Sequence, residues 1–415
     1  MDMIRNEEKT SRALLVSVDT GGFDTEASLA ELEELVKSAG AEPVFTMTQK
    51  LQRPESATFV GSGKLQEIKD VCEMQELDLI VVDSELSPSQ IKNIENFTDV
   101  RVIDRTTLIL DIFALRARSK EGKLQVELAQ LKYLLPRLTG KGVEMSRLGG
   151  GIGTRGPGET KIETDRRHIR RRMETLKEEL CEVEKHRHML RRRREKEGVI
   201  TCAIVGYTNA GKSTLMNTLT DAGVLAQDKL FATLDPTSRA LKLPGGVSVM
   251  LIDTVGLVRR LPHHLVDAFR STLEEAAQSD IIINLCDAAS DEVRVHLGVT
   301  NYLLESLGCG DRPIITVLNK CDLLDDSVML QDFAACVKIS AKTGEGIAGL
   351  LQEIENYLPV RMKHVCLQVP FAQAGLISDV REKGTLISEE YTADGIRAEV
   401  VVDEALYAKM KEYQC

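Results

Sequence analysis

The stretch that decides the fold of this chain is Gly206-Tyr207-Thr208-Asn209-Ala210-Gly211-Lys212-Ser213, which fits the phosphate-binding pattern G-x-x-x-x-G-K-[ST] at every fixed position. Apolar residues from Ile200 to Val205 precede it and a helix-compatible segment follows, as this pattern requires. Backbone amides and a helix N-terminus in such a loop surround phosphate groups with hydrogen-bond donors. The stretch therefore predicts a site for the phosphates of a nucleotide.

A second stretch, Asn319-Lys320-Cys321-Asp322, follows an apolar strand-like segment and indicates which base is bound. The Asp322 carboxylate would accept hydrogen bonds from the N1 and N2 donors of guanine, a donor pair that adenine lacks. Lys320 would lie along the face of the base. In Ser340-Ala341-Lys342, the Ala341 amide would donate to guanine O6. Together the two stretches predict GTP rather than ATP.

Residues between these stretches are expected to handle Mg²⁺ and the γ phosphate. Ser213 would bind Mg²⁺ directly, and Asp253 of Asp253-Thr254-Val255-Gly256 would hold it through water. A loop at Phe231–Thr237 would add one hydroxyl, from Thr233 or alternatively Thr237, and would change conformation after hydrolysis. We expect catalytic roles for Lys212, Thr233 and Gly256. The residues expected to contact GTP are Gly206, Tyr207, Thr208, Asn209, Ala210, Gly211, Lys212, Ser213, Thr214, Phe231, Thr233, Asp253, Gly256, Asn319, Lys320, Asp322, Ser340, Ala341 and Lys342.

One position departs from the common pattern of such enzymes. Leu257 follows Gly256 where many GTPases place a Gln that orients the attacking water. Leucine cannot hydrogen-bond that water, so intrinsic hydrolysis should be slow and assisted by a partner or a bound ion. Asn209 resembles the asparagine of potassium-dependent GTPases, and it could equally serve only to stabilise the loop. We therefore name Mg²⁺ as a cofactor and K⁺ as a second candidate.

Length and composition bound the class of protein. The 415 residues are too many for one ordinary core, and 43% are hydrophobic, as in soluble globular proteins. No signal-peptide segment or membrane-length apolar run is evident, and the nine cysteines are scattered. We expect a monomeric cytoplasmic protein, with partial association with the inner face of the membrane left open. The net charge of −11 argues against a protein that coats nucleic acid indiscriminately.

The predicted fold class is α/β, with four parts. Residues 1–104 alternate strand-like and helix-like segments, which predicts a parallel α/β domain. Residues 105–197 should form a long antiparallel helical hairpin, and residues 198–360 a P-loop GTPase domain. Residues 361–415 read as a small C-terminal α+β domain without a chemical motif.

The hairpin prediction rests on two matching apolar seams. Leucines recur at heptad-like spacing from Leu124 to Leu135, and a similar series runs from Ile162 to Leu190. A glycine-rich loop at 147–160 separates the two and should form the tip of an arm, because so many glycines do not support a regular element. The bland alternative is a flexible connector. From Arg137 to Glu197 the chain carries 18 Lys/Arg against 11 Asp/Glu.

Basic residues flank this loop and both ends of the second predicted helix, including Arg191 to Arg194. A solvated charged face explains the middle of that helix, whereas contact with RNA phosphates better explains its basic ends. The residues expected to contact RNA are Arg147, Gly149, Gly150, Gly151, Gly153, Arg155, Gly156, Gly158, Arg166 and Arg167.

The glycine-rich segment from Ser146 to Arg167 resembles the signature of HflX-type GTPases, as do Phe231–Thr237, Asp253–Leu257 and Phe59–Lys64. The resemblance covers nearly the whole chain and is weakest in the last fifty residues. It implies a GTPase that binds the large ribosomal subunit and splits stalled or idle ribosomes under stress. It also implies that the arm enters the region of the peptidyl transferase centre, and that the ribosome stimulates hydrolysis.

Two alternatives stay open at this point. The same nucleotide domain would serve a GTPase that acts in tRNA or rRNA maturation. Gly61-Ser62-Gly63-Lys64 could instead mark a second nucleotide site, for ATP, in an RNA-remodelling factor. That stretch lacks the upstream glycine of the full phosphate loop, because Thr58 stands there.

Overall fold

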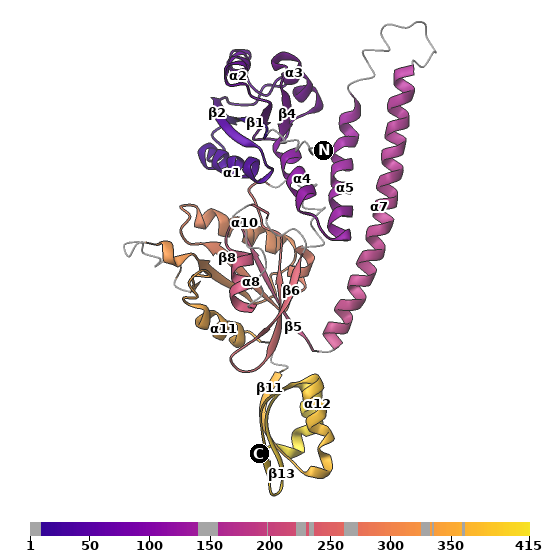
Figure 1. The fold of residues 1–415 in the computed structure, drawn as a ribbon, viewed down its shortest axis with the longest axis vertical. Helices are drawn as coiled ribbons and strands as arrows, with labels where there is room; N and C mark the ends of the chain where they lie inside the picture. The colour runs from indigo at the N-terminus through magenta and orange to yellow at the C-terminus, as the bar shows by residue number, and fades with distance from the viewer. Residues whose placement is uncertain are drawn as a thin grey trace, which may run out of the picture. The chain divides into compact units, whose positions relative to one another are not determined.

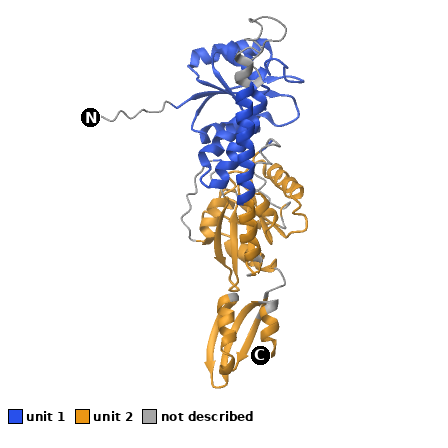
Figure 2. Ribbon diagram, turned by 90° about the vertical axis from the view of Figure 1, so that its right-hand side faces the viewer, with its two compact units in different colours: residues 1–183, 229–231, 259–269 blue, residues 184–228, 232–258, 270–415 orange. Residues whose placement is uncertain are grey.

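The structure is a computed structural model of the 415-residue chain. It describes residues 10–139, 157–196, 198–220, 230–231, 236–260, 273–324, 333, 336–358 and 362–415. The chain divides into two compact units, coloured in Figure 2. Unit 1 contains residues 1–183, 229–231 and 259–269, and unit 2 contains residues 184–228, 232–258 and 270–415.

Unit 1 begins with a four-stranded parallel sheet of order β2-β1-β3-β4 (Figure 1). Residues 13–18 and 79–82 are buried throughout, which suits central strands of a parallel sheet covered on both faces. Their apolar side chains pack with those of the helices in one core. The elements are β1 (Arg12–Asp19), α1 (Thr25–Ser38), β2 (Glu42–Lys50), α2 (Ser62–Gln75), β3 (Leu79–Val82), α3 (Pro88–Thr98) and β4 (Arg101–Asp104). The predicted parallel α/β domain is confirmed.

Local capping explains where these helices begin and end. The Asp24 side chain accepts from the amide of Ala27 at 3.0 Å, and α1 stops just before Gly40, whose φ is +87°. Ser87 and Gln90 form a capping box at the start of α3. Each of these contacts joins residues that are close together in the chain, so the local sequence determines where these helices begin and end.

The helices that follow form the predicted hairpin. They are α4 (Arg105–Arg116), α5 (Lys120–Leu134), the 3₁₀ helix η1 (Leu135–Thr139) and the 40-residue α7 (Pro157–Lys196). Arg172 of α7 donates to both carboxylate oxygens of Glu127 on α5 at 2.7 and 2.8 Å. Lys120 pairs with Glu179 at 3.9 Å. Numbers that rise on one helix and fall on the other establish the antiparallel arrangement seen in Figure 1.

The apolar seam is shorter than expected. Leu176 of α7 is fully buried, and Leu124 of α5 is also buried. Leu190 was expected in the same seam, but its side chain is 47% exposed. The antiparallel register places Lys120, the first residue of α5, near Glu179. Leu190 therefore has no partner turn on α5, and the heptad prediction is wrong at this position.

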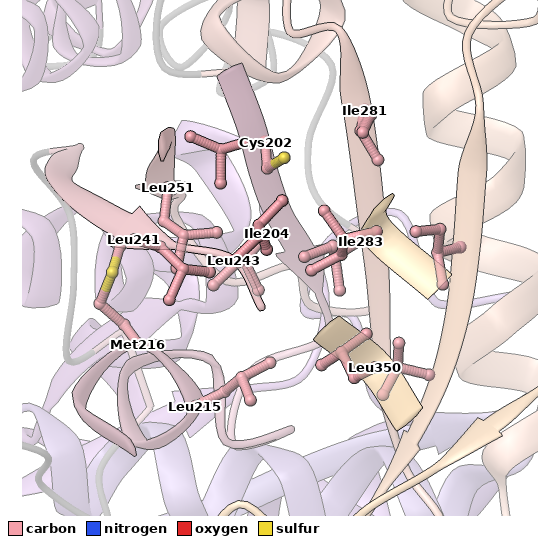
Figure 3. Packing of buried hydrophobic residues seen from close by; sticks show 14 of the residues in the cluster. Cys202, Ile204, Leu215, Met216, Leu241, Leu243, Leu251, Ile281, Ile283 and Leu350 are labelled. Carbon is pink, nitrogen blue, oxygen red and sulfur yellow. The ribbon is translucent and has the colours of Figure 1, made fainter. Parts of the chain in front are cut away.

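Unit 2 is built on a six-stranded sheet of order β10-β9-β8-β5-β7-β6, parallel except for β6. Buried side chains from the strands, α8 and α11 form its core (Figure 3). The predicted P-loop domain is confirmed. The elements are β5 (Ile200–Gly206), α8 (Lys212–Thr220), β6 (Thr237–Lys242), β7 (Ser248–Asp253), β8 (Ile281–Asp287), α10 (Val293–Ser306), β9 (Ile314–Asn319), η2 (Cys321–Leu323), β10 (Val337–Lys338) and α11 (Ile347–Asn356).

The C-terminal segment forms the predicted α+β domain within unit 2. Its antiparallel sheet has the order β11-β13-β12, and one face packs on α12 and α13. The elements are β11 (Met362–Val369), η4 (Phe371–Gln373), α12 (Gly375–Lys383), β12 (Thr385–Thr392), β13 (Gly395–Asp403), α13 (Glu404–Met410) and η5 (Lys411–Tyr413). Among the residues that the structure describes, no helix is both long and apolar enough to cross a membrane.

Candidate guanine-nucleotide site

The phosphate-binding loop leaves the carboxyl end of β5, which pairs in parallel with both β7 and β8. A Cβ on Gly206 would collide with the Leu285 carbonyl of β8, so only glycine fits there. Gly211 has a φ of +93°, and a Cβ there would collide with the side chain of Asn319. The two fixed glycines of the motif thus allow the close backbone packing on which the loop depends.

Lys212 begins α8 and is buried beneath this loop. Its ammonium donates to the carbonyl oxygens of Gly206 at 3.1 Å and Tyr207 at 2.8 Å. Burial lowers the pKa of Lys212 to about 8, although the nearby Asp253 carboxylate opposes the shift. A buried cation that donates to backbone carbonyls is well suited to attract phosphate oxygens.

The donor set beside Lys212 fits a magnesium ion. Ser213 donates to an oxygen of the fully buried Asp253 carboxylate at 2.9 Å. Thr237 is the register partner of Asp253 across β6 and β7, and its buried hydroxyl has no hydrogen-bond partner in the described structure. Hydroxyl and carboxylate oxygens are the ligands that Mg²⁺ prefers. Ser213 would hold the ion directly and Asp253 through water, with Mg²⁺ neutralising phosphate charge.

The segment after β7 is hydrogen-bonded onto the phosphate-binding loop. The Thr208 amide donates to the Leu257 carbonyl at 2.7 Å, and the Leu257 amide donates to the Gly206 carbonyl at 3.2 Å. A Cβ on Gly256 would lie 3.1 Å from Lys212 Nζ. Gly256 is thus next to the lysine that the motif assigns to the phosphates. The Leu257 side chain is buried. It has no polar group that could hydrogen-bond the water that attacks GTP.

Asn319 joins the phosphate-binding loop to the base-recognition loop. Its side-chain amide donates to the Ala210 carbonyl at 2.8 Å, and its side-chain oxygen accepts from the Ala341 amide at 2.8 Å. The residue is buried. The sequence pattern predicted that Asn319 contacts GTP. The structure gives it a positioning task, because both ends of its amide are engaged by backbone.

The base-recognition residues follow the carboxyl end of β9. Lys320 has a φ of +64° and donates to Asp287 at 2.7 Å. Asp322, in η2, is exposed, so its carboxylate is accessible to a base. Ser340 is buried, and its hydroxyl accepts from the Thr343 amide at 3.1 Å, while Lys342 is exposed. This arrangement places the Ser340–Lys342 turn beside Asn319.

Two residues at this end of the sheet were not found from the sequence. Asp287 ends β8 and fixes Lys320. His296 of α10 stacks on the Tyr207 ring of the phosphate-binding loop, with centroids 3.9 Å apart. Neither belongs to a linear motif. The usable signal for Asp287 was a carboxylate at the end of a buried strand, where parallel sheets place ligands.

The predicted switch loop is described only in part. Thr233 lies outside the described residues. Phe231 belongs to unit 1, where its ring meets Phe113 of α4 edge to face with centroids 4.5 Å apart. The neighbouring Leu230 amide donates to the Ser38 hydroxyl of α1 at 3.1 Å. Phe231 is therefore held by apolar and polar contacts with the N-terminal helices.

Most of the predicted ribosome contacts lie outside the described residues. These are Arg147, Gly149, Gly150, Gly151, Gly153, Arg155 and Gly156, and no side-chain environment is described around Gly158. On α7, Arg167 is exposed and Arg166 is half-buried. At the other end of this helix, Arg191 pairs with Glu275 at 3.0 Å. That arginine was expected to contact RNA, whereas the fold uses its charge within the protein.

The Gly61–Lys64 stretch forms the start of α2. The Gly61 amide donates to the Gln49 side chain at 2.9 Å. Lys64 pairs with Glu67 on its own helix at 2.8 Å. An ATP site here stays a prediction. Lys64 would have to break its ion pair with Glu67 in order to bind a phosphate group.

Three family profiles match the sequence in order along the chain. The GTP-binding GTPase N-terminal region matches residues 26–114, and the GTP-binding GTPase middle region matches residues 116–194. The 50S ribosome-binding GTPase family matches residues 201–320, which contain the phosphate-binding loop and end within the base-recognition motif. The profiles thus cover the N-terminal sheet, the helical hairpin and most of the nucleotide domain.

Known proteins resemble the chain over nearly its whole length. GTPase HflX of Lacrimispora saccharolytica is 50% identical over 416 residues, covering 99% of this chain and 98% of that protein. GTPase HflX of Escherichia coli is 42% identical, covering 88% and 87%. A GTP-binding protein of Sulfolobus solfataricus, solved with GDP, is 26% identical with a TM-score of 0.46, covering 84% and 98%. With such identity over so much of its length, the chain belongs to the HflX family of GTPases.

Proposed function

We propose that this protein binds the large ribosomal subunit, and that its nucleotide state controls the dissociation of stalled or idle ribosomes under stress. GTP, held with Mg²⁺ between Lys212, Ser213 and Asp322, defines the binding state. Hydrolysis to GDP and phosphate ends it. Thr233 supplies the hydroxyl that senses the γ phosphate, with Thr237 as the alternative.

The nucleotide half of this proposal is supported by the packing of Gly256 against Lys212. The Gly256 position leaves no room for a side chain, since a Cβ would lie 2.7 Å from the Thr208 side chain as well as 3.1 Å from the lysine ammonium. A γ phosphate would replace the Gly206 and Tyr207 carbonyls as the acceptor for the Lys212 ammonium. The adjacent Gly256 amide would then donate a hydrogen bond to the same phosphate. That exchange is the physical basis for a two-state response of the following segment.

The ribosomal half is supported by the helical hairpin and by the match to 50S ribosome-binding GTPases. An α-helix of 40 residues is about 60 Å long, enough to reach deep into a large partner. The side chain of Arg167 is exposed on this helix, and the glycine-rich segment at 147–160 precedes it. Exposed arginine next to backbone amides without bulky side chains is suited to RNA phosphates.

Sedimentation through sucrose gradients tests the proposal. Purified protein is mixed with 70S ribosomes or separate subunits, in the presence of GTP, GDP or a non-hydrolysable GTP analogue. We expect co-sedimentation with the large subunit in the triphosphate state and conversion of 70S particles to subunits. The matched control is Lys212→Ala, which should lose the nucleotide response. Binding to free RNA alone, with no binding to the large subunit in any state, would favour a role in RNA maturation and reject the proposal.

A pair of arm variants separates the two halves of the proposal. Arg166→Glu with Arg167→Glu should weaken subunit binding while leaving GTP affinity unchanged, because these residues are remote in sequence from every nucleotide motif. Glu163→Lys is the control for a charge change on the same helix. Equal binding by all three proteins would show that this part of the arm does not contact the ribosome.

A further inference from the structure

Two cysteines of the C-terminal domain face one another across an edge of its sheet. β11 is an edge strand of the three-stranded sheet, and beyond it Leu367 pairs with Gln414 in an antiparallel bridge. The Cys415 amide donates to the Cys366 carbonyl at 3.0 Å. These two residues are therefore directly opposite, and their sulfur atoms are 2.7 Å apart.

Direct opposition satisfies the geometric requirement of a disulfide. Residues that face each other in an antiparallel pair have Cα atoms about 4.5 to 5.5 Å apart. Disulfides need a Cα separation of about 4.4 to 6.8 Å. No backbone movement is needed to join Cys366 to Cys415, because the sheet edge already aligns them.

The surroundings of Cys366 favour its reactive form. Val365 and Leu367 point into the domain core, so Cys366 lies on the opposite face, which carries Arg397 and Glu399 of β13. The contacts with the Cys415 thiol and the Arg397 guanidinium lower the pKa of Cys366, whereas burial and the Glu399 carboxylate act in the opposite direction. The pKa of Cys415 is raised by the same contact. This is the asymmetry of a nucleophilic thiolate beside a resolving thiol.

The other described cysteines lack this combination. Four are buried in the cores of the protein, namely Cys72, Cys202, Cys286 and Cys309. Burial raises the pKa of each of these thiols, and it also raises the pKa of the half-buried Cys321 and Cys336. Cys181 is exposed on α7 and provides a natural internal comparison.

We propose that Cys366 and Cys415 form a reversible disulfide when the protein meets a peroxide. The Cys366 thiolate attacks one peroxide oxygen, the O–O bond breaks, and the other oxygen leaves as water or an alcohol after taking a proton. The Cys366 sulfenic acid is then attacked by the Cys415 sulfur, and the S–O bond breaks to release water. Two thiols are oxidised by two electrons, and the peroxide is reduced by two. A dithiol then reduces the Cys366–Cys415 disulfide back to two thiols and becomes a disulfide itself.

The bond would pin the segment after η5 to β11. It closes a loop between residues 49 positions apart, which contains α12, β12, β13 and α13. Closing such a loop restricts the unfolded chain and stabilises the folded domain. The nucleotide site is not part of this loop, so oxidation should change domain stability without changing GTP affinity.

Peptide mapping of the full-length protein tests the proposal. Reduced protein is treated with hydrogen peroxide, remaining thiols are blocked with N-ethylmaleimide, and the digest is analysed by mass spectrometry. We expect a linked Cys366–Cys415 peptide pair that disappears after dithiothreitol, together with a higher midpoint of thermal unfolding for the oxidised protein. Failure to link the pair, or irreversible oxidation of Cys366 without a disulfide, would overturn the proposal.

Three variants sharpen the test. Cys415→Ser should halt the reaction at a Cys366 sulfenic acid that dimedone traps, and Cys366→Ser should abolish both products. Cys181→Ser is the matched control and should behave as wild type. Arg397→Gln should slow the peroxide reaction severalfold, whereas Arg397→Lys should retain most of the rate. Equal rates for Arg397→Gln and wild type would contradict the role given to Arg397, and faster labelling of Cys181 than Cys366 would contradict the choice of site.

Discussion

Arg260 donates to the Asp83 carboxylate at 2.6 Å, although 177 residues separate the two in the chain. Asp83 follows β3, is almost fully buried, and also pairs with Arg105 at 2.8 Å. The Arg260 guanidinium in addition lies over the ring of Phe23, 4.1 Å from its centroid. Arg260, which belongs to unit 1, is thus held beside the N-terminal sheet by an ion pair that no linear motif reveals.

Loss of Arg260 should loosen the backbone at this residue. In Arg260→Ala, we expect faster amide hydrogen exchange at residues 259 and 260, because the ion pair and the ring contact are both removed. Global stability should change by less than about 1 kcal/mol, since Arg260 is partly exposed. Arg239→Ala, at an exposed arginine on β6, is the control. Unchanged exchange in this segment would contradict the anchoring role.

Asp83 should be far more important for stability than Arg260. Asp83→Ala leaves the buried Arg105 with Glu31 as its remaining carboxylate partner. Removing one partner of a buried ion pair costs about 3 to 5 kcal/mol, which chemical denaturation would detect as a lower midpoint. Asp70→Ala, at an exposed carboxylate on α2, should cost less than about 0.5 kcal/mol. Equal effects of the two substitutions would show that the Asp83 cluster is not stabilising.

GTP affinity should fall as pH rises above neutrality. Burial lowers the pKa of Lys212 to about 8, whereas phosphate oxygens favour its charged form. Binding therefore takes up a proton where the unbound lysine is neutral, and affinity should decline by up to about tenfold per pH unit above that pKa. Titration with a fluorescent GTP analogue between about pH 7 and pH 9 measures this.

The control for the pH experiment is Lys212→Met, which should bind weakly at every pH. It shares any titration of the nucleotide itself but lacks the lysine. A parallel decline of affinity in both proteins would assign the pH dependence to another group. Buffers of different ionisation enthalpy, used in calorimetry, would show the expected proton uptake directly.

Asp322 should determine which base is bound. In Asp322→Asn, one carboxylate oxygen becomes an amide donor that faces the donors of guanine, which costs about 1 to 3 kcal/mol of GTP binding. Xanthine carries an oxygen where guanine carries its amino group, so XTP should gain relative to GTP. Competition binding measures the ratio, with Asp311→Asn at an exposed carboxylate as the control. An unchanged preference for GTP would remove Asp322 from the base site.

Potassium should accelerate GTP hydrolysis relative to sodium. Leu257 provides no hydrogen bond for the attacking water, and Asn209 is an exposed residue of the phosphate-binding loop with a φ of +61°. Asn209→Gly keeps this backbone conformation accessible and removes the side chain with its amide oxygen, so it should abolish the potassium response. Steady-state phosphate release in the two salts measures the effect. Equal rates in sodium and potassium would exclude the ion.

Much of the nucleotide site was predictable because its signals are local. A phosphate-binding loop is one strand, one turn and the start of one helix, so a single stretch of chain carries every requirement. The Asp24 cap of α1 and the buried strand β3 were predictable for the same reason, because each depends on a short segment of the chain. The prediction that Leu190 is buried in the seam failed because a heptad pattern shows which face of one helix is apolar, but it does not show how far the partner helix extends.

The amino-acid sequence by itself determined the α/β fold, the GTP motifs and the place of the helical hairpin, since each depends on residues that are close together in the chain. Only the tertiary structure decided that Asp287 fixes Lys320, that Asp83 holds Arg260 and that Cys366 faces Cys415. Those pairs join residues that are far apart in the chain. Strand order and register bring them together, and a hydrophobic pattern read along the sequence does not contain that information.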